Sequence, residues 1–116
     1  MVKLKFQAAW TESAVRDLEE IVLYIVADSI SAARKMLRTI QKKATSLETM
    51  PERGRMVPEL LQIGIRAYRE LIAQPYRIVY RVSEHSVFIL SVLDSRRDLE
   101  DLLLERLLGQ SGRPGV

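Results

Sequence analysis

Arginine is the residue type with the clearest chemical potential in this sequence, and its spacing follows the expected strands. In the run PYRIVYRV, side chains alternate between the faces of a strand, so Arg77 and Arg81 share one face while the two tyrosines share the other. Guanidinium groups bind carboxylate and phosphate bidentately, and residues just past a strand end are well placed for binding. We therefore predict contacts to an anionic or protein target from five residues: Arg69, Arg77, Arg81, Arg96 and Arg97.

The charge balance sets a limit on that interpretation. Residues 53–97 hold eight basic side chains, all of them arginine, against four acidic ones, although the net charge of the chain is only +3. This asymmetry is too small to predict general nucleic-acid binding. A solvated surface with a few ion pairs is the alternative, in which Glu70 neutralises a neighbour across the strands.

Other chemistries find little support in the sequence. The chain has no cysteine, its single histidine, His85, falls in an expected turn, and no glycine-rich phosphate loop, Ser/His/Asp set or metal-ligand spacing occurs. We predict no catalytic residue, no metal site and no cofactor. The acidic residues Glu12, Asp17, Glu19 and Glu20 are expected on the solvent side of a helix.

Periodicity predicts one α+β domain over residues 1–108, followed by a flexible tail over 109–116. Strands are expected at 3–8, 66–73, 76–83 and 87–93. A helical hairpin is expected to begin at Glu12 after a Thr11 cap and to break at Asp28 and Ser29. The segment 50–64 is expected to be a loop, and a leucine-rich helix is expected over 99–108. The fold class is a small antiparallel sheet, made of the N-terminal strand and three C-terminal strands, with a packed helical hairpin and a C-terminal helix. No signal-peptide core or membrane-spanning run is visible, so we expect a soluble cytoplasmic protein without membrane contact.

From about Lys3 to Leu108, this order of elements resembles the ParE/RelE toxin superfamily. The resemblance lies in WTESAVRDLEEIVLYI, in PERG, and above all in YRIVY followed by VLDSRRD. It implies a toxin of a type II toxin–antitoxin system that forms a hetero-oligomer with its antitoxin, which would wrap across the hairpin and the sheet.

Two targets are compatible with the resemblance. The SRRDLE ending looks more like ParE members, which bind DNA gyrase without catalysis of their own, and this is the favoured function. RelE-like members cut messenger RNA on the ribosome. A metal-independent ribonuclease would need Tyr68, Tyr76 or Tyr80 for proton transfer, because no tyrosine, histidine or lysine follows Arg97. A third alternative is an inactive member that binds only the antitoxin.

Overall fold

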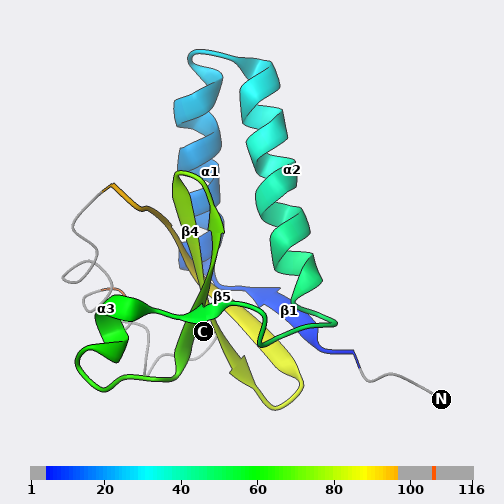
Figure 1. Ribbon diagram of the computed structural model, residues 1–116. Helices are drawn as coiled ribbons and strands as arrows, with labels where there is room; N and C mark the ends of the chain where they lie inside the picture. The colour runs from blue at the N-terminus through cyan, green and yellow to red at the C-terminus, as the bar shows by residue number, and fades with distance from the viewer. Residues whose placement is uncertain (1–4, 97–105, 107–116) are drawn as a thin grey trace.

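The computed structural model describes residues 5–96 and Arg106. Its elements follow in the order β1 (Gln7–Trp10), α1 (Glu12–Val26), α2 (Ile30–Ser46), β2 (Arg55–Met56), α3 (Pro58–Leu61), β3 (Tyr68–Ala73), β4 (Tyr76–Ser83) and β5 (Ser86–Asp94). In Figure 1 the helices α1 and α2 run side by side as a hairpin that projects beyond the sheet, and α3 lies well away from the hairpin. The predicted α+β class is confirmed.

The sheet has five strands in the order β1-β5-β4-β3-β2. Strand β1 pairs with β5 in parallel, starting with Gln7 opposite Ser86, and every other pairing is antiparallel. The three predicted antiparallel C-terminal strands are confirmed, and the predicted sheet differs at its two edges, where β1 pairs in parallel and β2 adds a fifth strand. A parallel pair needs a long crossover, and here the chain between β1 and β5 includes the helical hairpin.

The loop predicted over residues 50–64 contains two short elements that periodicity could not reveal. Strand β2 is two residues long and exists through its pairing with β3, Arg55 opposite Glu70. Helix α3 is a single turn with Pro58 at its start, where the missing N–H costs nothing. The helix predicted at 99–108 and the tail at 109–116 lie outside the described residues, except for Arg106.

Side-chain caps begin both hairpin helices, as the sequence predicts for the first. The Thr11 hydroxyl oxygen accepts a hydrogen bond from the Ala14 N–H at 3.2 Å and donates one to the Ile89 carbonyl at 3.1 Å, so the cap also ties α1 to β5. The Ser29 hydroxyl accepts from the Ala32 N–H at 3.1 Å at the exposed start of α2. None of the helices in the described part of the chain is long and apolar enough to cross a membrane.

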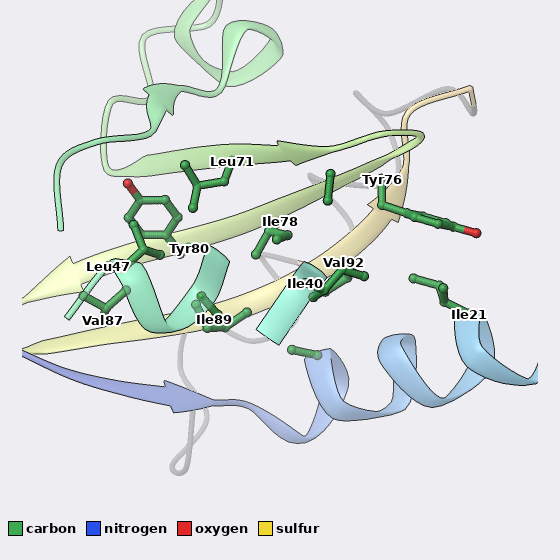
Figure 2. Close-up of a cluster of buried hydrophobic side chains, with 13 residues drawn as sticks. Ile21, Ile40, Leu47, Leu71, Tyr76, Ile78, Tyr80, Val87, Ile89 and Val92 are labelled. Atoms are coloured by element: carbon green, nitrogen blue, oxygen red, sulfur yellow. The ribbon is translucent and has the colours of Figure 1, made fainter. Parts of the chain in front are cut away.

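Apolar side chains fill both sides of the sheet. The larger cluster packs the hairpin against one side and includes Ile21, Ile40, Ile78 and Tyr80, which Figure 2 shows converging between the helices and the strands. We call this the hairpin side. The smaller cluster gathers Val57, Leu60, Val79, Leu90 and Leu93 on the opposite side, which we call the α3 side. The predicted alternation along β4 is confirmed, because Ile78 and Tyr80 belong to the first cluster and Val79 to the second.

A bulge in β5 changes the order of its side chains. Val79 lies opposite Ser91 and Tyr80 opposite Ile89, which leaves Leu90 as an extra residue between the pairs. Leu90 packs on the α3 side, whereas Ile89 and Val92 both pack on the hairpin side. The bulge therefore lets an almost continuous apolar run serve both cores.

Candidate functional site

The predicted arginines do not form one surface. Arg69 lies opposite Tyr80 and so on the hairpin side, because directly paired residues share a face. Arg77 and Arg81 lie on the α3 side of β4, and Arg96 follows the end of β5. Arg97 lies outside the described residues. Among the four described residues of the predicted set, only Arg77 and Arg81 thus share a strand face, and no hydrogen bond joins their side chains.

Arg77 is the centre of a buried ionic network. Its Nε donates to Glu70 Oε1 at 2.7 Å, and its two terminal nitrogens bind the two carboxylate oxygens of Glu59 at 2.8 and 2.6 Å. These contacts raise the pKa of Arg77 above its ordinary value, with the Glu59 hydrogen bonds as the main cause. The same hydrogen bonds lower the pKa of Glu59.

Glu70 extends this network to the edge of the sheet. The side chain is fully buried, and its second oxygen accepts a hydrogen bond from Arg55 Nε at 2.7 Å. Two carboxylates and two guanidiniums therefore link α3, β2, β3 and β4. The charge of Arg77, on the strand face expected to be cationic, is thus neutralised by Glu59 and Glu70. The neutralising role anticipated for Glu70 is confirmed.

Arg69 also has a partner within the chain. Its Nη1 donates to the carbonyl oxygen of Gly54 at 2.7 Å and to that of Glu52 at 3.3 Å. Both acceptors belong to the connection between α2 and β2, so the side chain fixes this connection over the sheet. Whether Arg69 also meets a target stays a prediction.

Arg96 lies beside a hollow between α1 and the end of β5. Its Nε and Nη2 bind the two oxygens of Asp94 at 2.9 and 2.5 Å, and this contact raises the pKa of Arg96. The hollow has a volume of about 440 Å³, and its described lining is Asp17, Glu20, Ile21, Tyr24, Tyr76, Val92, Leu93, Asp94, Arg96 and Arg106. Three carboxylates and two guanidiniums thus face it, which makes the described lining net negative.

Sequence reasoning missed two features of this hollow. Asp17 was expected in solvent, but its Oδ2 accepts hydrogen bonds from the Val92 N–H at 3.0 Å and from Arg106 Nη1 at 2.8 Å. Tyr24 is 70% exposed beside Arg96, although it lies in an otherwise apolar stretch of α1. Its neighbour Leu23 is similarly exposed. The local sequence does not indicate this exposure near the end of the hairpin, because it depends on the tertiary structure.

The tyrosines named for proton transfer are mostly inside the protein. Tyr76 and Tyr80 are buried in the hairpin-side core, and burial raises the pKa of both. The Tyr80 hydroxyl oxygen accepts a hydrogen bond from the Gly54 N–H at 3.0 Å. Tyr68 is half-buried against the α3-side cluster. The Tyr80 hydroxyl is therefore closed to a substrate, whereas Tyr76, although largely buried, lines the hollow beside Arg96.

Two comparisons of sequence bear on the identity of the chain. A family model described as "ParE toxin of type II toxin-antitoxin system, parDE" matches residues 8–99. A curated protein of Sinorhizobium fredii (strain NBRC 101917 / NGR234), named "Putative toxin Y4kP", is 33% identical over 96 residues, which cover 81% of this chain and 93% of that protein.

Solved structures share the fold. A chromosomal ParDE TA system from P. aeruginosa matches with a TM-score of 0.62 at 23% identity, covering 77% of this chain and 95% of that chain. The toxin-antitoxin complex RelBE2 from Mycobacterium tuberculosis matches with a TM-score of 0.58 at 23% identity, covering 80% and 94%. The predicted ParE/RelE resemblance is confirmed, and the chain belongs to the ParE toxin family of type II toxin–antitoxin systems.

Proposed function

We propose that this toxin inhibits DNA gyrase by binding the enzyme as a protein partner, and that a cognate antitoxin neutralises it. Membership of the ParE family supports a toxin, and the two structural neighbours come from toxin–antitoxin systems. The toxin acts in this proposal through a binding surface and catalyses no reaction.

The burial of Tyr76 and Tyr80 is the observation that carries the choice between gyrase and messenger RNA. A general acid or base must reach the reacting group, and its pKa should lie near the working pH. Burial raises the pKa of both hydroxyls further above neutral pH, so neither is tuned for proton transfer. The described lining of the hollow beside Arg96 is net negative, which is also a poor match for RNA phosphates.

A supercoiling and cleavage assay tests the proposal. Purified toxin, separated from antitoxin, should reduce supercoiling by DNA gyrase and increase cleaved DNA, and added antitoxin should reverse both effects. Messenger RNA cleavage by the same sample on ribosomes, with gyrase unaffected, would replace the proposal with the ribonuclease alternative. A folded sample that binds antitoxin but affects neither target would be an inactive family member.

The arginines after β5 provide a sharper arm of the same assay. We expect the Arg96→Ala, Arg97→Ala double variant to inhibit gyrase roughly 10-fold less, since a lost charge-assisted contact is worth about 1.5–3 kcal/mol. Arg38→Ala is the matched control, because Arg38 is an exposed arginine of α2 outside the predicted set. Equal inhibition by both variants would remove Arg96 and Arg97 from the binding surface.

A further inference from the structure

Arg81 carries an unsatisfied hydrogen-bond donor. Its Nε is buried without a hydrogen-bond partner, and no other buried side-chain nitrogen or oxygen in the described part of the chain shares that condition. Arg69 and Arg77, in contrast, both donate to oxygen atoms of this chain. A buried donor left without a partner costs about 1–3 kcal/mol, and native proteins contain few of them. The folded toxin therefore carries a local cost at Arg81.

The strand register defines the surroundings of this side chain. Tyr68 on β3 and Phe88 on β5 both lie directly opposite Arg81, so the three side chains form a row across the α3 side of the sheet. Tyr68 and Phe88 are half-buried and pack against the cluster that contains Val79 and Leu90. The row thus presents one guanidinium with an aromatic residue on each neighbouring strand.

We propose that Arg81 is a receptor for a single carboxylate carried on an apolar segment of a protein partner. A carboxylate can accept two parallel hydrogen bonds from Nε and a terminal nitrogen of one guanidinium, which would satisfy the unpaired donor. Apolar residues beside that carboxylate would contact Tyr68 and Phe88. The Nε edge must turn outward to bind, and this turn breaks no hydrogen bond because Nε makes none.

A nucleic-acid backbone fits this row less well. Binding to a phosphate chain depends on several unpaired cations along a surface. The row contains one cation, and the next arginine on the same face, Arg77, is already neutralised by Glu59 and Glu70.

The inference rests on the proposed function because it requires that the toxin binds a protein. The carboxylate can belong to the target or to the antitoxin.

Titrations followed by nuclear magnetic resonance test the ligand chemistry directly. The Arg81 Nε–H signal is assigned by its loss in Arg81→Lys, and the probes are the blocked peptide Leu-Glu-Leu, the blocked peptide Leu-Gln-Leu and inorganic phosphate. We expect the glutamate peptide to shift the Arg81 signal and the glutamine peptide to leave it in place, while the signal of exposed Arg66 stays unchanged with both. A larger shift with phosphate, or equal shifts at Arg81 and Arg66, would overturn the proposal.

A second experiment separates binding from folding. Arg81→Met removes the charge and the unsatisfied donor but keeps an unbranched side chain, so the isolated variant should have a higher urea midpoint than the wild-type chain. The same variant should bind the antitoxin or DNA gyrase about 10-fold more weakly. Arg66→Met is the control and should change neither quantity.

Each outcome of this experiment has one meaning. Unchanged affinity of Arg81→Met for both proteins, or a lower urea midpoint, would assign Arg81 a structural role and overturn the proposal. If the wild-type toxin fails to inhibit gyrase, the proposed function fails, whereas the peptide titration and the antitoxin affinity still decide the role of Arg81.

Discussion

Arg77 and Glu70 are diagonal neighbours on adjacent strands, and the 2.7 Å contact between Arg77 Nε and Glu70 Oε1 joins two nearly inaccessible side chains, 7% and 0% exposed. The pair lies where β3 and β4 meet α3. Because Glu59 occupies the remaining nitrogens of Arg77, the register of β3 against β4 and the position of α3 depend on the same guanidinium.

Removing Glu70 should destabilise the fold strongly. Glu70→Ala leaves Arg77 buried with half of its carboxylate partners, and breaking a buried ion pair costs about 3–5 kcal/mol. The control is Arg55→Ala, which removes the 60% exposed partner of the same carboxylate and should cost less, about 1–3 kcal/mol, because Glu70 keeps its bond to Arg77. Urea denaturation of both variants measures the difference, and equal losses would contradict the assigned role of Arg77.

The Glu59 carboxylate should contribute to the acid stability of the toxin. Its pKa lies below the ordinary value of 4.5 in the folded chain, chiefly through hydrogen bonds from Arg77. Its contribution is therefore present above pH 4.5 and is lost as the pH falls through the lowered folded value. Glu59→Gln should show a shallower loss of unfolding free energy between pH 5 and pH 3, roughly the titration range of carboxylates.

A matched variant checks that this slope belongs to Glu59. Glu19 is an exposed carboxylate of α1, and Glu19→Gln should keep the wild-type slope. Parallel curves for wild type and Glu59→Gln would show that the ion pair with Arg77 does not contribute to acid stability.

The two buried tyrosines should respond differently to loss of the hydroxyl group. Tyr80→Phe leaves the buried Gly54 N–H without its acceptor and should cost about 1–3 kcal/mol. The Tyr76 hydroxyl points away from the core cluster in Figure 2, so Tyr76→Phe should be nearly neutral. Thermal denaturation measures the stability, and growth inhibition at equal soluble expression should persist in both. Loss of toxicity in a stably folded Tyr76→Phe variant would favour the ribonuclease alternative.

The caps of the hairpin helices should differ in their contribution to stability. Thr11→Ala removes the cap of α1 and the hydrogen bond to the Ile89 carbonyl, and should cost about 2 kcal/mol. Ser29→Ala removes an exposed cap of α2 and should cost about 1 kcal/mol or less. Circular dichroism during urea titration gives both values, and a larger loss at Ser29 would mean that the contact between Thr11 and β5 adds nothing.

Local patterns were sufficient for the elements that carry their own signal. Alternation in PYRIVYRV placed β4 at residues 76–83, as observed, and put Ile78 and Tyr80 opposite Val79. The cap residue Thr11 and the break at Asp28 and Ser29 likewise bounded α1. In each case the physical cause acts over a few neighbouring residues.

The partners of the arginines could not be predicted in the same way. Glu59 is far from Arg77 in the sequence and reaches it because α3 folds over the sheet, and α3 itself has too few residues for a periodic pattern. Asp17 meets Arg106 through tertiary structure as well. Arginine spacing therefore identified the faces of β4 and the role of Glu70, whereas Glu59 and Asp17 meet Arg77 and Arg106 through elements that only the complete fold brings close.

The parallel pairing of β1 with β5 has a consequence for synthesis on the ribosome. The first strand to be translated finds its neighbour only after Ser86–Asp94 has been made, because Gln7 pairs with Ser86 and Trp10 with Ile89. Strand β5 is also the partner of β4, so a nascent chain that stops before residue 86 lacks the strand that joins the two ends of the sheet. Translation interrupted before residue 86 would thus release fragments in which β1 has no place in the sheet, and a cell that makes this toxin meets its complete surface only after β5 has been read.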